Sequence, residues 1–257
     1  MLKAYYQLTK PGIIYGNLIT AAAGFFLASA GRINLWLLIL TLLGTSLVIA
    51  SACVFNNYFD REIDAQMSRT KNRGLVKGTI STQNALMFAT ALGIIGFGVL
   101  IVYVNLTTVI VGLIGFFDYV IFYTFSKKLT VWATLIGSVA GATPIVAGYT
   151  AVTNRFDLSA LILFLILTAW QMPHFYAIAT YRMDDYANAK IPVLPVKAGI
   201  LATKIQILLF IVGFVIASSA EIASSNSRRS ASNAGPGLKV PIIVPWSQVS
   251  TVINPIS

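Results

Sequence analysis

The chain has 257 residues, of which 57% are hydrophobic and only 10% are charged, and its mean hydropathy is +0.79. Soluble domains carry roughly 25% charged residues. The few charges of this chain could not cover the surface of a water-soluble fold, so a soluble protein is excluded. The net charge of +10 does not indicate a nucleic-acid partner, because the basic residues lie in short loops between apolar segments. This distribution is typical of the cytoplasmic loops of membrane proteins.

Seven apolar segments follow one another along the chain. Most of them approach the ~20 residues that a helix needs to cross the hydrocarbon core of a bilayer. They cover residues 12–30, 34–55, 85–104, 108–125, 131–152, 158–178 and 200–217. The sequence therefore predicts an all-α fold, a polytopic transmembrane bundle of about seven helices.

The distribution of lysine and arginine predicts how this bundle is oriented. If the N-terminus is cytoplasmic, thirteen of the 18 basic residues lie in cytoplasmic segments, and only Arg32 and Arg155 lie in the opposite loops. Positive charge is enriched in cytoplasmic loops, so the N-terminus is predicted to be cytoplasmic. The small residues at 28–30 resemble a signal-peptide cleavage site, but the next apolar segment follows too closely, and we interpret the first segment as an uncleaved helix.

The composition of the chain changes after Ala217. Residues 219–237 are rich in serine, alanine and asparagine, and prolines interrupt the apolar residues that follow. No helix of spanning length is expected there, because proline breaks a helix. We predict a membrane domain over residues 1–217 and an atypical, disordered, non-membrane tail over residues 218–257.

Three oxygen-bearing side chains follow the second apolar segment. Asn56, Asp60 and Asp64 are four residues apart, so a helix would place them on one face. Two carboxylates and an amide oxygen suit Mg²⁺, which takes carboxylates together with substrate phosphates and water. Glu62 would point to the opposite side. The alternative interpretation is a solvated helix end, because charges cost little at the membrane surface.

Basic residues near this acidic face favour a metal–diphosphate site. Arg69, Lys71 and Arg73 follow it directly, and Lys127 and Lys128 end the fourth apolar segment on the same predicted side. A diphosphate binds cationic side chains directly as well as through a metal. A second acidic loop, at residues 184–185, follows the sixth apolar segment on the same predicted side. A site built where these loops converge is geometrically reasonable, although the sequence alone does not show that they converge.

The motifs resemble, in order along the chain, those of the UbiA-type intramembrane prenyltransferases, and among them the protohaem IX farnesyltransferase (haem O synthase) family. The resemblance covers residues 5–217 and is carried by segments 8–14, 53–64, 69–73, 170–174 and 191–196. The superfamily motif Asn-Asp-x-x-Asp-x-x-x-Asp is matched at Asn56, Asp60 and Asp64, with Asn57 at the second position. Because the family has two more membrane spans than this sequence, we expect a C-terminally truncated or altered chain.

The resemblance implies that a farnesyl group passes from farnesyl diphosphate to a vinyl group of haem b, with addition of water, to give haem o for terminal oxidases. It implies that Asn56, Asp60 and Asp64 hold Mg²⁺ as the cofactor. The residues implied to neutralise the leaving diphosphate are Arg69, Lys71, Arg73, Lys127 and Lys128. The aromatic rings expected to stabilise the allylic cation belong to Tyr58, Tyr123 and Tyr181.

Three residues depart from the family pattern or have an open role. The second superfamily motif is Asp-x-x-x-Asp, but Asp185 has no acidic residue four positions before or after it, so it is a weaker metal ligand. His174, the one histidine, is a candidate haem-iron ligand or base, or else a hydrogen-bonded residue beside Pro173. Asp118 lies in the middle of the fourth apolar segment, where a charge is costly, and its role is open.

The resemblance also implies the surroundings and partners of the protein. These are a lipid bilayer, the bacterial cytoplasmic (inner) membrane with the catalytic loops on the cytoplasmic side, farnesyl diphosphate, haem b, and haem-processing or oxidase-assembly proteins. Two alternatives stay open. One is a prenyltransferase that acts on an aromatic or quinone precursor, and the other is a seven-helix transporter or receptor.

Overall fold

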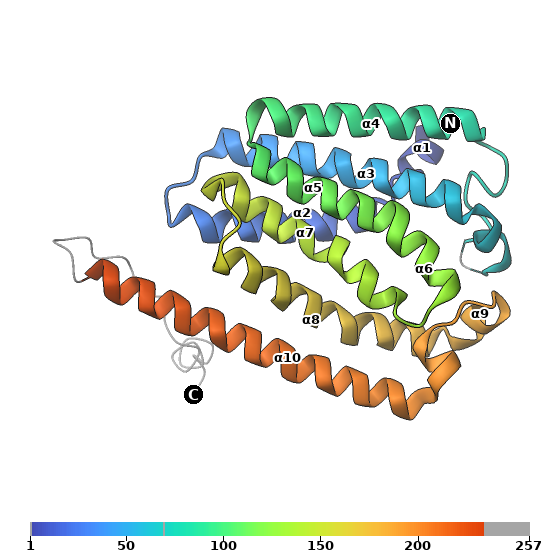
Figure 1. The fold of residues 1–257 in the computed structure, drawn as a ribbon. Coiled ribbons are helices and arrows are strands. Elements are labelled where there is room, and N and C mark those ends of the chain that lie inside the picture. The colour runs from blue at the N-terminus through green and yellow to red at the C-terminus, as the bar shows by residue number, and fades with distance from the viewer. Residues whose placement is uncertain (1, 69, 234–257) are drawn as a thin grey trace, which may run out of the picture. The chain divides into compact units, whose positions relative to one another are not determined.

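The computed structural model describes residues 2–68 and 70–233, with side chains up to residue 222. In this part of the chain every regular element is helical (Figure 1). The helices are α1 (Leu2–Leu8), α2 (Pro11–Ser29), α3 (Leu35–Gln66), α4 (Thr82–Tyr103), α5 (Leu106–Phe117), the π-helix η1 (Asp118–Tyr123), α6 (Thr124–Leu129), α7 (Ala133–Thr153), α8 (Leu158–Tyr181), α9 (Met183–Asn188) and α10 (Leu194–Asn233).

Seven helical segments among the described residues are long and apolar enough to span a membrane, which confirms the predicted polytopic helical fold. Helices α5, η1 and α6 follow without a break and form one such segment, Leu106–Leu129. Several helices begin at a side chain that caps the first turn. Asn34, Asn105 and Asp157 each accept a hydrogen bond from the backbone amide three residues later, which satisfies a donor that the helix itself cannot.

Helix α7 is the central element of the bundle. It packs against α2, α5 and α8, and α3 packs mainly against α4 (Figure 1). The contact between α2 and α7 is close, because any side-chain carbon at Gly148 would collide with the backbone of Ala21. Small residues at such contacts let transmembrane helices approach one another. In the most apolar stretch of α7, 61% of the residues are buried.

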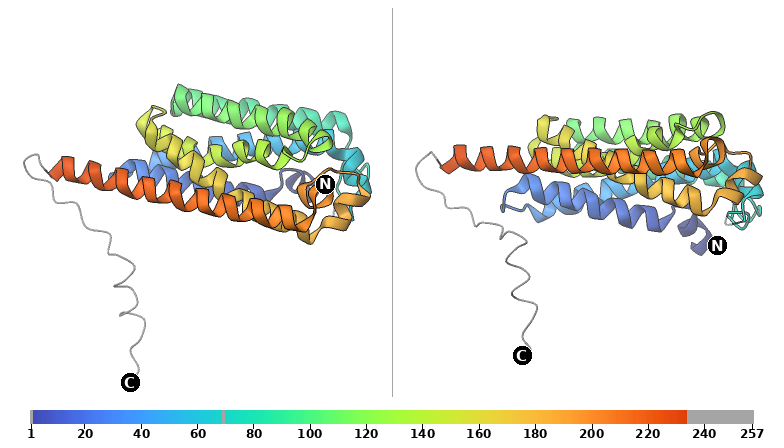
Figure 2. Two further views of the ribbon diagram at one scale, coloured as in Figure 1. Left: turned by 60° about the horizontal axis from the view of Figure 1, so that its bottom comes forward. Right: turned by 90° about the horizontal axis from the view of Figure 1, so that it is seen from below.

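The chain divides into two units, Met1–Ser219 and Ala220–Ser257, and α10 continues across the boundary. Within the first unit, α10 lies beside α8, where the rings of Phe210 and Tyr176 are 6.3 Å apart (Figures 1 and 2). Only 6% of the most apolar stretch of α10 is buried. This helix therefore contributes little to the core of the unit.

The end of the last helix differs from the prediction. We expected the helical part to end at Ala217, but α10 continues to Asn233. The physical reason is that neither proline nor glycine occurs between Gly213 and Gly235, and alanine and glutamate favour the helix. The predicted disorder of the tail falls partly on residues 234–257, which lie outside the described residues, and the proposed domain division stays a prediction.

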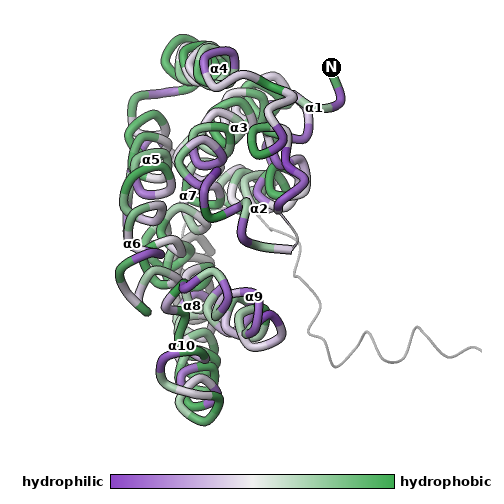
Figure 3. The backbone as a smooth tube through the Cα atoms, turned by 90° about the vertical axis from the view of Figure 1, so that its right-hand side faces the viewer, coloured by the Kyte–Doolittle hydropathy of each residue, from purple (hydrophilic) through white to green (hydrophobic). Residues whose placement is uncertain are grey.

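One end of the first unit carries several hydrophilic loops and short helices. The loop after α3, helix α6 and helix α9 lie at this end, and hydrophilic stretches gather there when the bundle is seen along its helices (Figures 1 and 3). The structure brings together loops that the sequence placed only on the same side of the membrane. Ser68, just after α3, donates a hydrogen bond to Asp185 of α9 at 2.9 Å.

Candidate active site

A cavity of about 540 Å³ opens among α2, α3, η1, α6, α7 and α8. Its wall changes character with depth. Charged and polar side chains line it near the C-terminal end of α3: Lys10, Asn56, Asp60, Asp64, Thr70, Arg73, Tyr119, Tyr123 and Lys127. Further along α3 and α7 the wall is mainly apolar, with Val48, Ile49, Ala52, Pro144 and Ala147. A ligand with a charged head and an apolar body fits such a gradient.

The acidic face that the spacing predicted is present and buried. Helix α3 continues through it to Gln66, and the residues Asn56, Asp60 and Asp64 are only 2%, 4% and 5% exposed. Glu62 lies on the other side of the helix, where it is exposed and 3.8 Å from Arg61. The interpretation as a solvated helix end is therefore wrong for the three cavity residues.

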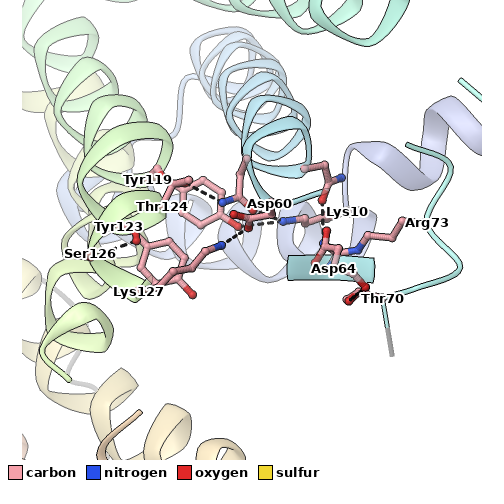
Figure 4. Close-up of polar contacts among 12 residues, drawn as sticks. Lys10, Asp60, Asp64, Thr70, Arg73, Tyr119, Tyr123, Thr124, Ser126 and Lys127 are labelled. Atoms are coloured by element: carbon pink, nitrogen blue, oxygen red, sulfur yellow. Dashed lines mark hydrogen bonds and ion pairs between the residues drawn. The ribbon is translucent and has the colours of Figure 1, made fainter. Parts of the chain in front are cut away.

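Each residue of the acidic face is paired with a cation from a different part of the chain, and Figure 4 shows the cations that face Asp60 and Asp64. Lys10, just before α2, donates to Asn56 Oδ1 at 2.6 Å. Lys127 of α6 forms an ion pair with Asp60, and Arg73 donates to Asp64 Oδ2 at 2.5 Å. Buried carboxylates need such partners, because an unpaired charge in a low-dielectric site is costly.

One oxygen of the Asp60 carboxylate has no hydrogen-bond partner among the described residues. Its Oδ2 is engaged by Lys127, whereas its Oδ1 is buried and accepts no hydrogen bond from any described residue. A buried acceptor of this kind is rare in native proteins and indicates a ligand or ion. No group of three His, Cys, Asp or Glu side chains gathers among the described residues, so the donor set on offer is two carboxylates and the Asn56 amide. This hard oxygen set fits Mg²⁺.

A further layer of hydrogen bonds fixes the acidic face. Asn57 donates to the Leu8 carbonyl at 2.9 Å and accepts from Arg73 at 3.0 Å, so it holds the cation that faces Asp64. Asn56 donates to Thr124 Oγ1 at 2.9 Å, which ties α3 to α6. The amide at the second motif position thus supports the site without itself lining the cavity.

Two stacked tyrosines stand next to the acidic face. The rings of Tyr119 and Tyr123, on η1, are 5.5 Å apart and nearly parallel. Lys10 lies 5.6 Å from the centre of the first ring and Lys127 lies 5.5 Å from the centre of the second. Both rings line the cavity. Tyr119 was missed from sequence, although its spacing of four residues from Tyr123 and eight from Lys127 is a signal that could have found it.

The other two predicted aromatic residues lie elsewhere. The Tyr58 ring contacts Arg61, whose guanidinium carbon is 4.8 Å from the ring centre. Tyr181 is 85% exposed at the end of α8. Neither lines the cavity, so the structure does not bring them to the reacting groups.

The five predicted basic residues separate into two sets. Arg73 and Lys127 line the cavity and contact the carboxylates. Lys71 and Lys128 are exposed and do not line the cavity. Arg69 lies outside the described residues. On helix α6, Lys127 and Lys128 separate because adjacent residues of a helix point in different directions.

Lys10 is a cationic residue of the site to which the sequence assigned no role. It precedes Pro11, the first residue of α2, with a left-handed backbone (φ 53°). Burial is the largest influence on its ammonium group and lowers its pKa to about 8, while Asp60 opposes the shift. Its position next to the first spanning helix, on the same predicted side as the acidic face, is the sequence feature that could have identified it.

The second acidic loop does not join the acidic face of α3. Asp185 accepts hydrogen bonds from Ser68 at 2.9 and 3.0 Å and lies 3.6 Å from Arg182. It does not line the cavity, although its neighbour Tyr186 does. Its carboxylate therefore ties two loops together in this structure, and its predicted role as a metal ligand gains no support from the contacts.

His174 and Asp118 also lie outside the cavity wall. His174 is exposed on α8, and its ring stacks on Trp170 with centres 5.7 Å apart. Asp118 is buried and accepts a hydrogen bond from the Ala140 amide at 3.0 Å, so it connects η1 to α7. This contact supplies the partner that the sequence did not reveal. The role of His174 towards haem stays a prediction.

Comparisons with known proteins give a consistent result. The model of the UbiA prenyltransferase family matches residues 17–226. A protoheme IX farnesyltransferase of Acinetobacter baylyi is 54% identical over 215 residues, which are 83% of this chain and 74% of the relative. The protein of the same name from Sodalis glossinidius is 55% identical over 218 residues, which are 84% of this chain and 73% of the relative.

Solved structures with low sequence identity share the fold. A UbiA homologue from Archaeoglobus fulgidus, bound to GPP and Mg²⁺, has a TM-score of 0.69 and 15% identity, and the match covers 96% of this chain and 93% of that one. A structure described for digeranylgeranylglyceryl phosphate synthase has a TM-score of 0.73 and 21% identity, with coverage of 87% and 78%.

Proposed function

The chain belongs to the UbiA prenyltransferase family, and from that premise we propose that it transfers a farnesyl group from farnesyl diphosphate to haem b. Water adds in the same reaction, and the product is haem o. The observation that carries the proposal is the buried acidic face, paired with three cations, at the head of a cavity whose deeper wall is apolar. The names of relatives about 54% identical to this chain support haem b as the acceptor.

The polar head of the cavity is suited to a diphosphate. Asp60 and Asp64, with Asn56, would hold Mg²⁺, which when bound neutralises charge on the leaving phosphate. Binding of the metal to these oxygens would free their present partners, Lys127 and Arg73. Both side chains would then be within reach of phosphate oxygens, which they bind directly. The exchange of partners keeps every charge in the site compensated.

The stacked tyrosines are placed to stabilise the cation that forms when the bond to the diphosphate breaks. Ionisation of the allylic C–O bond leaves a cation at the first farnesyl carbon, and an aromatic face attracts a cation. Tyr123 and Tyr119 stand beside Lys127 and Lys10, so their faces lie just beyond the cations that would hold the diphosphate. The mainly apolar wall further along α3 and α7 would receive the farnesyl chain.

The protein is an integral membrane protein, and both substrates have large apolar parts that would enter from the bilayer. We place it in the bacterial inner membrane with the N-terminus and the acidic face cytoplasmic, on the basis of the lysine and arginine distribution. Haem-processing or oxidase-assembly proteins are proposed as partners. Membership in a prenyltransferase family decides against a seven-helix transporter or receptor.

The proposal is tested in membranes that contain the full chain, supplied with Mg²⁺, farnesyl diphosphate and haem b. Liquid chromatography with mass spectrometry should detect haem o, and chelation of Mg²⁺ should abolish it. The double variant Asp60→Ala, Asp64→Ala should make none, whereas Glu62→Gln on the exposed side of α3 should retain wild-type activity. Prenylation of an aromatic acid in place of haem b would overturn the choice of acceptor.

A further inference from the structure

One amide side chain stands in the wall of the cavity away from the acidic face. Gln171 of α8 is 6% exposed and lines the cavity. Its Nε2 donates to the carbonyl of Leu167 at 2.9 Å and to the carbonyl of Ser138, on α7, at 3.4 Å. Both N–H groups are thus engaged by backbone carbonyls, which fixes the orientation of the amide. No described group donates a hydrogen bond to its Oε1.

The backbone of α7 makes room for this oxygen. A side-chain carbon at Gly141 would collide with Gln171 Oε1, so only glycine leaves the space that the amide occupies. Gly141 also lines the cavity. The oxygen is therefore held at the cavity wall between α7 and α8, and an acceptor that faces a cavity is expected to bind a donor there.

The position of this oxygen relative to the acidic face follows from α7. A carbon at Gly137, one turn before Gly141, would collide with the ring of Tyr123. The ring and the amide thus occupy successive places on one face of α7, separated by about 6 Å along its axis. Tyr123 is next to Lys127, which pairs with Asp60. The amide oxygen lies one turn deeper than the aromatic pair, away from the polar head.

We infer that Gln171 Oε1 holds and orients the water molecule that adds to haem during prenyl transfer, and this inference rests on the proposed function. The farnesyl C1–O bond breaks and its electron pair leaves with the diphosphate. The vinyl π pair then bonds the terminal vinyl carbon to C1, which leaves a cation on the inner vinyl carbon. The oxygen of the bound water forms a bond to that carbon, and one of its protons passes to the diphosphate.

The amide acts by orientation, because it does not take a proton near neutral pH. A hydrogen bond from the water to Oε1 directs a lone pair of the water towards the cavity. Without that acceptor, the cation loses a proton from the neighbouring carbon, and the product is an alkene that is lighter than haem o by one water. The ratio of hydrated to alkene product therefore reports on Gln171 separately from the overall rate.

The experiment measures this ratio by mass spectrometry in membranes that contain the full-length chain or its variants. Gln171→Met keeps the volume and removes the acceptor, so the ratio of hydrated to alkene product should fall by about tenfold. Gln171→Glu keeps an oxygen acceptor and should retain most of the hydrated product. Gly141→Ala should displace the amide oxygen and lower the ratio although Gln171 is unchanged.

The matched control is Thr168→Val, which removes a buried hydroxyl of the same helix that does not line the cavity, and its ratio should equal that of the wild type. An unchanged ratio in both Gln171→Met and Gly141→Ala, with only the total product reduced, would overturn the inference and leave the proposed function intact. If Gln171→Met makes no product, an unchanged ratio in Gly141→Ala would overturn the inference and a lowered ratio would support it. A wild-type chain that prenylates no haem would overturn both.

Discussion

The two acidic clusters of this protein each come after an apolar segment of spanning length, yet their surroundings differ. Asp60 and Asp64 lie inside a 32-residue helix that packs on several neighbours, and both are almost fully buried. Asp185 lies in the six-residue helix α9, where no residue is buried, and it is held by Ser68 and Arg182. The first cluster faces a cavity, and the second fastens one loop to another.

The difference shows what makes a carboxylate available for a metal. In the first cluster each acid has a single cationic partner, and Asp60 keeps one buried oxygen without a partner. In the second, both oxygens of Asp185 share the single hydroxyl hydrogen of Ser68. A buried carboxylate oxygen without a hydrogen-bond partner is therefore a better sign of a metal ligand than an acidic residue in a loop is.

The largest effect is expected from the acids themselves. Asp60→Asn should lower kcat for haem prenylation by roughly three orders of magnitude, because the metal loses a charged ligand at the leaving group. Asp185→Asn should lower it by less than about tenfold, since the amide can still accept from Ser68. Steady-state rates at saturating Mg²⁺ test this contrast. Equal losses in the two variants would make Asp185 part of the metal site.

The next effect concerns the cations. Lys127→Met should raise KM for farnesyl diphosphate by about 10- to 100-fold, because a charged hydrogen bond to phosphate is lost. Lys128→Met, one residue away and exposed, should leave KM within about twofold of the wild type. Initial rates over a range of farnesyl diphosphate concentrations measure both. A larger effect at Lys128 would contradict the site geometry.

An intermediate effect is expected from the stacked ring next to Lys10. Tyr119→Leu should lower kcat by about tenfold with little change in KM, because the aromatic face acts on the cation formed after binding. Tyr119→Phe keeps that face and should stay within about threefold of the wild type. Tyr181→Leu, at the exposed end of α8, is the matched control and should have no effect. Equal rates in the Leu and Phe variants would exclude a role for the ring.

The smallest effect is expected at the loop contact. Ser68→Ala removes both hydrogen bonds to Asp185, and an exposed contact of this kind contributes less than about 1 kcal/mol. Activity should stay within about twofold of the wild type. Amide hydrogen exchange in residues 183–193 should become faster, and it reports the loss of loop docking directly. A severe loss of activity would show that the second loop contributes to catalysis.

The helices and the acidic face were accessible from the sequence because both depend on local spacing. Apolar runs of spanning length fixed the seven helices, and a four-residue repeat placed Asn56, Asp60 and Asp64 together. The end of the last helix was predicted wrongly at Ala217, because a polar composition was taken as the end of helical structure. Helix formation continued where no proline or glycine opposed it.

Packing between segments that are distant in the sequence decided which side chains meet in the cavity. Which basic residues reach the acids depends on contacts such as Lys10 with Asn56, 46 residues apart, and Arg73 with Asn57. The place of the Gln171 amide depends on a glycine of another helix, which no local pattern reveals. The sequence by itself determined the membrane fold and the residue types and spacing of the acidic face, since periodicity and residue type are local. The tertiary structure decided which side chains share the cavity, because only the folded chain brings separate helices together.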